Sequence, residues 1–225
     1  MQITVNKVSV TIDDILILKD INLTLNNRRI GIVGCNGSGK STFLKLLNGL
    51  IIPSEGSVFV NGLDTKKKSK EIRRDVGFLF QNPDNQIIMP TVSEELLLGL
   101  SFLGFSEVEK KNRLEEVINL YNLSNLIDRP SHSLSGGEKQ LLALAAVMIT
   151  KPKILVCDEP TTLLDFRNER VIMDNILRLD CNVILVSHNL DYFKSFDEIL
   201  LIDKGSVVNK GVPGNITNKY IELMK

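Results

Sequence analysis

The amino-acid sequence predicts an α/β fold with three parts: an amino-terminal antiparallel β region, a core built on a parallel sheet, and an inserted α-helical subdomain. Three patterns support this prediction. Apolar and polar residues alternate near the amino end, short uncharged runs recur later, and helical periods fill roughly residues 89–150. With 225 residues, 43% of them hydrophobic, the chain can build one large domain with a sizeable core.

The amino-terminal region predicts strands and then one helix. Apolar residues alternate from Ile3 to Val10 and again from Ile21 to Leu25, which is typical of antiparallel strands. The apolar stretch Ile30–Val33 leads into a glycine-rich turn, and an amphipathic helix is expected to begin near Lys40. The residues expected on the buried face of this helix are Phe43, Leu44, Leu46 and Leu47.

Uncharged strands and a helical insertion complete the chain. Each of these strands lacks charge, as a parallel sheet covered on both faces requires; they are Gly77–Phe80, Ile154–Cys157 and Val183–Val186. We expect a single domain with these parts: a core of residues 1–88 and 151–205, a helical subdomain of residues 89–150, and a short tail of residues 206–225 with one strand and one helix.

Composition excludes several classes of protein. The 27 Lys and Arg residues balance 27 Asp and Glu residues, so no basic field attracts nucleic acid. The run Lys66–Lys70 is interpreted as a solvated loop rather than a phosphate-tracking patch. Three cysteines without C-x-x-C spacing argue against a disulfide framework and favour a reducing cytosol. No export signal is recognisable, and the longest apolar run, Leu141–Ile149, is far short of the ~20 residues that cross a bilayer.

The segment Gly34–Ser41 matches the pattern G-x-x-x-x-G-K-[ST] between a predicted strand and a predicted helix, which makes an ordinary glycine-rich turn the weaker alternative. Backbone N–H groups of such a loop converge on phosphates. Lys40 is expected to reach the β- and γ-phosphates and the Ser41 hydroxyl to coordinate Mg²⁺. The pattern predicts a P-loop NTPase (RecA-like) core; its nucleotide-binding residues are Gly34, Asn36, Gly37, Ser38, Gly39, Lys40, Ser41 and Thr42. Cys35 is interpreted as a filler rather than an activated thiol.

Two carboxylates follow the apolar strand Ile154–Cys157. Adjacent side chains of an extended segment point in different directions, so the two can hold different roles. Asp158 is placed to hold Mg²⁺, directly or through water, and Glu159 to polarise an attacking water. A solvated turn would explain this pair equally well by itself, and the upstream P-loop favours the catalytic interpretation.

Two further polar residues end predicted strands. Gln81 could contact Mg²⁺ or the water from a mobile loop. His188 could hydrogen-bond the γ-phosphate, although a lone histidine is more often structural. His132 lies in a polar turn and is interpreted as structural.

Six segments, taken in order, resemble the full motif set of an ABC ATPase. They are GCNGSGKST, Gln81, Leu134-Ser135-Gly136-Gly137-Glu138, LVCDEP, the Thr162–Asp165 turn and Ser187-His188. The resemblance covers nearly the whole chain. It implies a head-to-tail dimer with two ATP molecules at its interface, formed with an identical or a related second ATPase subunit. It further implies that Ser135, Gly136, Gly137 and Glu138 bind the partner's nucleotide, and that Asp165 links the two sites.

Within that family, Phe80–Gln86 followed by Met89–Val92 resembles the corresponding loop of energy-coupling-factor importers. These use a transmembrane coupling subunit and a small substrate-binding membrane subunit to import vitamins, cobalt or nickel. Arg28–Gly34, the short tail and the Asp-Glu-Pro-Thr-Thr-Leu-Leu-Asp run are most similar to the biotin-uptake ATPases of this group. The resemblance implies a peripheral protein at the cytoplasmic face of the cell membrane.

Two departures from the family pattern concern the base and the P-loop strand. Ile12 stands where the family often has an aromatic residue that stacks on adenine, and Arg28-Arg29 replaces the usual Gly-Glu. Neither touches the phosphate chemistry. Both leave the choice of nucleotide base less defined than hydrolysis, and ATP is the default expectation.

A coupling surface is expected on the moving segment Gln81–Val92. Asp84, Glu94 and Glu95 could receive basic residues of the transmembrane partner, or could equally be plain solvated charges.

The competing class is a soluble ABC ATPase that acts on DNA or ribosomes. The DNA type would need a long heptad-patterned coiled coil, and the ribosomal type usually joins two cassettes; the sequence has neither feature. A binding module without catalysis is disfavoured by the presence of Lys40, Asp158, Glu159 and His188 together. Co-purification with membrane proteins would separate a transporter subunit from the soluble class.

Overall fold

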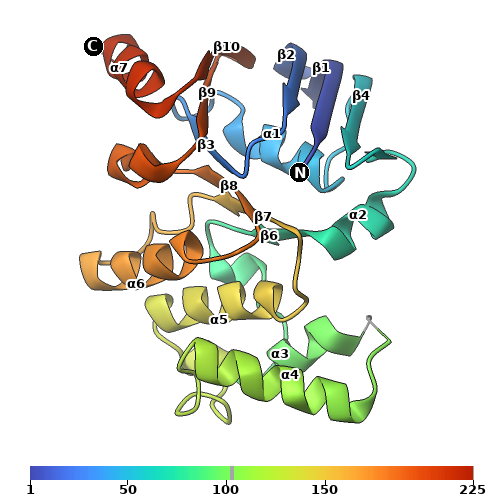
Figure 1. Ribbon diagram of the computed structural model, residues 1–225, viewed down its shortest axis with the longest axis vertical. Helices are drawn as coiled ribbons and strands as arrows, with labels where there is room; N and C mark the ends of the chain where they lie inside the picture. Colours follow the sequence, from blue (N-terminus) through green and yellow to red (C-terminus); the bar gives the residue numbers. More distant parts are fainter. Residues whose placement is uncertain (102–103, 225) are drawn as a thin grey trace. The chain divides into compact units, whose positions relative to one another are not determined.

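The computed structural model describes residues 1–101 and 104–224, which divide into two compact units (Figure 1). The core unit comprises Met1–Phe78, Lys153–Glu159 and Leu179–Lys225, and the helical unit comprises Leu79–Pro152 and Pro160–Arg178. No helix of the described ranges is long and apolar enough to span a bilayer.

The antiparallel sheet of the core unit has the strand order β2-β1-β4-β5. Its strands are β1 (Ile3–Ile12), β2 (Ile15–Leu25), β4 (Glu55–Val60) and β5 (Leu63–Asp64). The first two form a longer hairpin than the alternation predicted, because Asp13 and Asp14 both adopt positive φ and make a tight turn. The antiparallel prediction for this region is therefore confirmed.

The second sheet has six strands in the order β10-β9-β3-β8-β7-β6. They are β3 (Arg29–Val33), β6 (Val76–Leu79), β7 (Ile154–Asp158), β8 (Asn182–Val186), β9 (Glu198–Asp203) and β10 (Ser206–Gly211). The pairs β3–β8, β3–β9 and β7–β8 are parallel, and β10 runs antiparallel to β9. Each strand predicted for the parallel sheet is present, whereas β4, β5 and β9 were not predicted.

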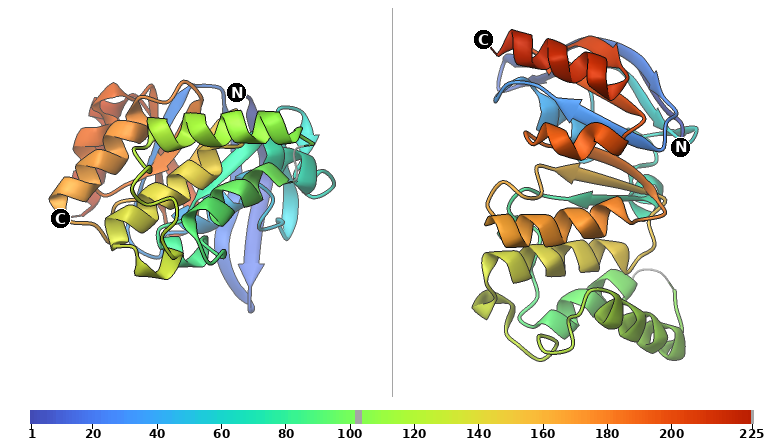
Figure 2. Two further views of the ribbon diagram at one scale, coloured as in Figure 1. Left: turned by 90° about the horizontal axis from the view of Figure 1, so that it is seen from below. Right: turned by 60° about the vertical axis from the view of Figure 1, so that its left-hand side comes forward.

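The helices of the core unit are α1 (Lys40–Leu47), α2 (Ser69–Asp75), the 3₁₀ helix η3 (Leu190–Ser195) and α7 (Pro213–Leu223). All four apolar residues expected on the inner face of α1 are fully buried. The carboxyl-terminal helix α7 packs against β9 and β10, as Figure 2 shows.

The helical unit contains α3 (Val92–Ser101), α4 (Glu107–Leu120), α5 (Gly136–Met148) and α6 (Phe166–Leu177), with the short 3₁₀ helices η1 (Pro83–Asn85) and η2 (Ser131–Ser133). Helix α5 packs against both α3 and α6 (Figures 1 and 2). Its residues Leu142, Ala143, Leu144 and Ala145 are fully buried, so α5 forms the apolar centre of this unit.

The arginine pair before the P-loop strand has a structural role. Arg28 Nη2 donates to the Asp180 carbonyl at 2.8 Å, and Arg29 Nη2 donates to the Leu179 carbonyl at 2.8 Å. The backbone N–H of Arg29 also donates to the Asp197 carboxylate at 2.7 Å. Both guanidinium groups therefore satisfy carbonyls in the turn that enters β8, which explains why two cations stand here.

Candidate nucleotide site

The glycine-rich loop connects the carboxyl end of β3 to α1 in the core unit. Gly37 and Gly39 have φ angles of 74° and 101°, a region that favours glycine. A Cβ on Gly39 would lie 2.6 Å from the Leu18 side chain, so this position also lacks space for any other residue. The loop thus places its backbone N–H groups at the amino end of α1, where the helix dipole attracts anions.

Lys40 is folded back over this loop and is only 5% exposed. Its ammonium donates to the carbonyls of Gly34 at 2.9 Å and Cys35 at 3.0 Å. It also lies 3.7 Å from the Glu159 carboxylate. Three acceptors therefore hold a buried cation at the site where the sequence predicts phosphates, and its charge complements an incoming anion.

Ser41 and Asp158, two of the residues that the sequence predicts to hold Mg²⁺, are in contact. The Ser41 hydroxyl donates to Asp158 Oδ1 at 2.9 Å, and Asp158 is 6% exposed. Burial raises the pKa of the Asp158 carboxyl; the Ser41 hydrogen bond opposes this rise and the neighbouring Glu159 charge adds to it. A hydroxyl and a carboxylate are hard oxygen donors, so this pair fits Mg²⁺ bound together with phosphate oxygens.

Glu159 occupies a constrained position directly after β7. Its φ of 48° is uncommon for a non-glycine residue, and its backbone N–H donates to the Val186 carbonyl at 3.2 Å. One carboxylate oxygen, Oε1, lies 3.1 Å from His188 Nε2. Such backbone outliers persist where surrounding contacts over-determine them, and they cluster at functional sites.

The core unit therefore brings together five of the predicted site residues: Lys40, Ser41, Asp158, Glu159 and His188. They follow the parallel strands β3, β7 and β8, whose carboxyl ends lie at one edge of the sheet. Ligands of α/β proteins bind at this edge.

Helix α7 and its C-cap residue contribute two residues that sequence reasoning missed. Met224 Sδ lies 3.3 Å from Cys35 Sγ, so the end of the chain contacts the P-loop. Tyr220 is buried, and burial raises the pKa of its hydroxyl, with smaller contributions from Cys35 and Glu159. The sequence predicted a helix in the tail, but no local pattern indicated where it would pack.

The other predicted site residues belong to the helical unit: Gln81, the Ser135–Glu138 segment and Asp165. Gln81 is exposed and lies just before η1. The loop that follows it is fastened by Gln86, whose Oε1 accepts from the Phe80 N–H at 3.2 Å and whose Nε2 donates to the Ala143 carbonyl of α5 at 3.0 Å. This loop is therefore tied to α5 by side-chain contacts.

The three carboxylates expected to receive a partner's basic residues have different surroundings. Glu95 is 5% exposed and its Oε2 accepts from the N–H groups of Ile88 and Met89 at 2.9 and 2.8 Å, so its assignment to an exposed coupling surface is wrong. Asp84 forms an ion pair with Lys139 at 2.7 Å. Glu94 accepts two hydrogen bonds from Thr91.

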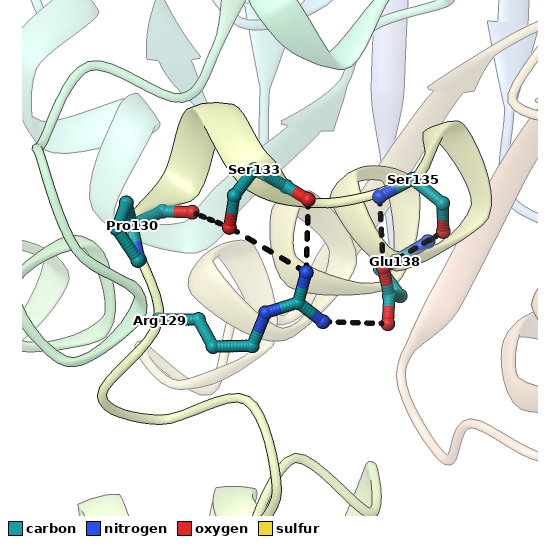
Figure 3. A network of polar contacts seen from close by, with 5 residues as sticks. All are labelled: Arg129, Pro130, Ser133, Ser135 and Glu138. Carbon is teal, nitrogen blue, oxygen red and sulfur yellow. Dashed lines mark hydrogen bonds and ion pairs between the residues drawn. The ribbon is translucent and has the colours of Figure 1, made fainter.

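The segment Leu134–Glu138 forms the start of α5, shown in Figure 3. Glu138 Oε2 accepts from the Ser135 N–H and hydroxyl, both at 2.8 Å, and these hydrogen bonds lower the pKa of the Glu138 carboxyl. The other oxygen lies 3.3 Å from Arg129, which also donates to the Ser133 carbonyl at 2.9 Å. A reciprocal capping box therefore fixes the first helical turn.

Asp165 is the N-cap of α6. Its Oδ1 accepts from the Asn168 N–H at 2.8 Å and its Oδ2 from the Asn168 side-chain amide at 2.9 Å. The backbone hydrogen bond from Asn168 is the largest cause that lowers the pKa of this exposed carboxyl. His132, interpreted as structural, is exposed in η2.

Comparison with protein families and curated proteins finds one consistent group. The family model described as ABC transporter matches residues 18–162. A putative ABC transporter ATP-binding protein of Bartonella henselae is 47% identical over 219 residues, which cover 97% of each chain. A biotin transport ATP-binding protein of Rhizobium etli is 39% identical over 92% of both chains. An energy-coupling factor transporter ATP-binding protein of Caldanaerobacter subterraneus is 39% identical over 93% of this chain and 78% of its own.

Solved structures give the same result. The chain is similar to cbiO1 of Clostridium perfringens, described as part of the ABC transporter complex cbiONQ, with a TM-score of 0.84, 28% identity and coverage of 99% and 93% of the two chains. It is also similar to a dimeric ATP-binding cassette, MJ0796, bound to ADP and phosphate, with a TM-score of 0.82, 28% identity and coverage of 94% and 98%.

Proposed function

The chain belongs to the ABC transporter family as an ATP-hydrolysing subunit, and from this premise we propose that it energises an energy-coupling-factor importer whose cargo is biotin. The observation that carries the ATPase chemistry is the convergence of Lys40, Ser41, Asp158, Glu159 and His188 at one edge of the parallel sheet. The biotin transport relative, at 39% identity over 92% of both chains, supports the cargo. Cobalt, nickel or another vitamin is the alternative cargo.

Each residue of the site has a role in this proposal. Lys40 binds the β- and γ-phosphates, and Glu159 polarises and deprotonates the water that attacks the γ-phosphorus. His188 orients that carboxylate and donates to the γ-phosphate. Ser41, Asp158 and Gln81 would hold Mg²⁺, which neutralises charge that develops on the phosphate oxygens.

The helical unit completes the site of a second subunit in this proposal. Ser135, Gly136 and Gly137 at the amino end of α5 contact the γ-phosphate held by the partner's P-loop, Glu138 caps this turn, and Asp165 links the two sites. The partner is an identical chain or a related ATPase subunit. ATP closes this dimer because only the closed state lets the second subunit contact phosphate, and hydrolysis reopens it.

One pocket of the helical unit supports the proposed coupling surface. Its volume is about 240 Å³, and Ile88 on its rim is 72% exposed. The other lining residues are Asp84, Ile87, Met89, Pro90, Ser131, His132 and Lys139. An exposed isoleucine beside a pocket suits an apolar segment of a membrane partner. We assign this surface to the transmembrane coupling subunit, which carries the substrate-binding membrane subunit and holds the ATPase at the cytoplasmic face of the membrane.

The decisive experiment purifies the intact membrane complex through this chain and identifies the bound small molecule by mass spectrometry. We expect a transmembrane subunit, a small membrane subunit and biotin. Cobalt, nickel or another vitamin in place of biotin would select the alternative cargo. Recovery of DNA or ribosomes without membrane proteins would contradict the importer assignment.

Glu159→Gln tests the catalytic assignment separately. This variant keeps the shape of the side chain but cannot take a proton, so hydrolysis should stop while ATP still binds and promotes a stable dimer on size-exclusion chromatography. Unchanged hydrolysis would overturn the role of Glu159. In a mixed dimer, Ser135→Arg on one subunit should damage the site formed by the other subunit's P-loop.

A further inference from the structure

The two glycines of the Ser135–Glu138 segment have different surroundings. A Cβ added to Gly136 would meet no atom within 4 Å, and Gly136 is exposed. A Cβ added to Gly137 would lie 2.5 Å from Asn168 Oδ1 and 2.7 Å from Asn168 Nδ2, with Asn168 Cγ closer still. Gly136 therefore leaves space for a ligand, whereas Gly137 lets α5 approach one particular side chain of α6.

Asn168 has little freedom to move away from Gly137. Its backbone N–H donates to Asp165 Oδ1 and its Nδ2 donates to Asp165 Oδ2, at 2.8 and 2.9 Å. Rotation of the side chain to make room at Gly137 would break the second hydrogen bond. The planar amide of Asn168 is thus confined between the Asp165 carboxylate and the first turn of α5.

We propose that Asn168 is a positioning residue that sets the placement of the Ser135–Glu138 segment relative to Asp165. The inference rests on the proposed function, in which both elements meet the second subunit. The capping box fixes the first turn of α5 internally, and Asn168 fixes that turn against α6. A phosphate site made of backbone N–H groups depends on such placement, since a shift of about 1 Å can cost on the order of a hundredfold in rate.

Three variants test the contact itself. Gly137→Ala should push Asn168 off Asp165 and lower kcat by on the order of tenfold to a hundredfold. Asn168→Ala should lower kcat as well, because the placement of α5 loosens. The double variant Gly137→Ala/Asn168→Ala should be more active than Gly137→Ala alone, because removal of the amide makes room for the new methyl group. If the fold-losses in kcat of the two single variants simply multiply in the double variant, the inference is overturned.

Asn175→Ala is the matched control. Asn175 lies on the same helix, and its side-chain amide donates to the Val171 carbonyl at 2.8 Å. The Asn175→Ala substitution removes the same chemical group from α6 but leaves the contact between Asn168 and α5 intact, so hydrolysis should stay unchanged. A loss equal to that of Asn168→Ala would show a general weakening of α6 and would contradict a positioning role.

A second readout separates positioning from stability. Asn168→Ala should bind a fluorescent ATP analogue to the P-loop of the single subunit as the wild type does, while ATP-driven dimer formation in the Glu159→Gln background weakens. Equal loss of both would overturn the inference. If Glu159→Gln alone leaves hydrolysis unchanged, the proposed function fails; if it stops hydrolysis and Asn168→Ala relieves nothing in Gly137→Ala, only the positioning role fails.

Discussion

His188 Nε2 lies 3.1 Å from Glu159 Oε1, and this contact joins the ends of two neighbouring parallel strands. Glu159 has a φ of 48° and its backbone N–H bonds to Val186, so the carboxylate is held from both its backbone and its side chain. The Lys40 ammonium lies 3.7 Å from the same oxygen. If Glu159 is the general base, as the proposed function has it, the cation and the imidazole orient it before any substrate arrives.

The first prediction concerns His188→Ala. Loss of the imidazole frees the Glu159 carboxylate to rotate toward Lys40, so kcat should fall about a hundredfold or more, within the usual range for acid–base catalysis. ATP affinity of the P-loop should change little, because Lys40 and the loop remain. Phosphate release at saturating ATP measures kcat. A variant with wild-type kcat would show that Glu159 needs no support from His188.

The second prediction concerns Asp158→Asn and the stability of the protein without metal. Burial raises the pKa of this carboxyl, so ionisation is less favourable in the folded than in the unfolded state. The contribution of this carboxyl to the stability of the fold is fully present below its pKa in the unfolded state. It is lost as the pH rises through its higher pKa in the folded state, so at neutral pH the ionised carboxylate opposes folding. Asparagine removes that charge.

In metal-free buffer at pH 7, Asp158→Asn should therefore raise the melting temperature, and for a chain of this size each 1 kcal/mol gained would appear as a rise of about 2–4 °C. Asparagine Oδ1 can still accept from the Ser41 hydroxyl. Differential scanning calorimetry measures the shift, and Mg²⁺-dependent hydrolysis by the same variant should fall. A lower melting temperature would show that the charge stabilises the fold.

Local patterns predicted the phosphate-binding half of the site. The loop that ends at Lys40 and the strand that ends at Asp158 are each a short, continuous stretch of sequence. The two strands and the helix that flank these motifs are present as predicted. The antiparallel hairpin and the parallel strands were predicted for the same reason, because alternation and uncharged runs are read residue by residue. The roles of the individual side chains stay predictions, as do the domain boundaries at residues 89 and 150.

Contacts between distant residues were not predictable. Cys35 and Met224 are separated by 189 positions, and the packing of α7 on β9, β10 and η3 brings them together. Glu95 carries a charge and was expected at the surface, yet two backbone N–H groups satisfy its buried carboxylate. The sequence shows neither the helix packing nor the hydrogen-bond partner that decides such cases.

The third prediction concerns Glu95→Ala in the helical unit. Removal of this carboxylate leaves the N–H groups of Ile88 and Met89 without their acceptor, which costs about 1–3 kcal/mol for a buried group. The loop carrying Ile88 should then exchange its amide hydrogens faster, and association with the membrane subunits should weaken. Hydrogen exchange by mass spectrometry and co-purification measure the two effects. Glu94→Ala, which removes an acceptor of Thr91 at an exposed position, is the control.

The fourth prediction concerns the pair Arg129 and Glu138. Glu138 places a negative charge at the amino end of α5, where the proposed function brings the γ-phosphate of a second subunit, and like charges repel. Arg129 lies 3.3 Å from Glu138 and offsets this charge (Figure 3). Arg129→Gln should therefore raise the KM for ATP by a few-fold, since a partly exposed pair contributes about 1 kcal/mol or less.

The compensating variant distinguishes charge from structure. Glu138→Gln keeps an acceptor for the Ser135 N–H and hydroxyl but removes the charge, so Arg129→Gln/Glu138→Gln should recover a KM close to that of the wild type. Added salt should shrink the effect of Arg129→Gln, because partly exposed charges are screened. If the double variant keeps the raised KM and salt changes nothing, Arg129 acts through its hydrogen bond to the Ser133 carbonyl, which holds the turn before α5, and the charge of Glu138 does not oppose nucleotide binding.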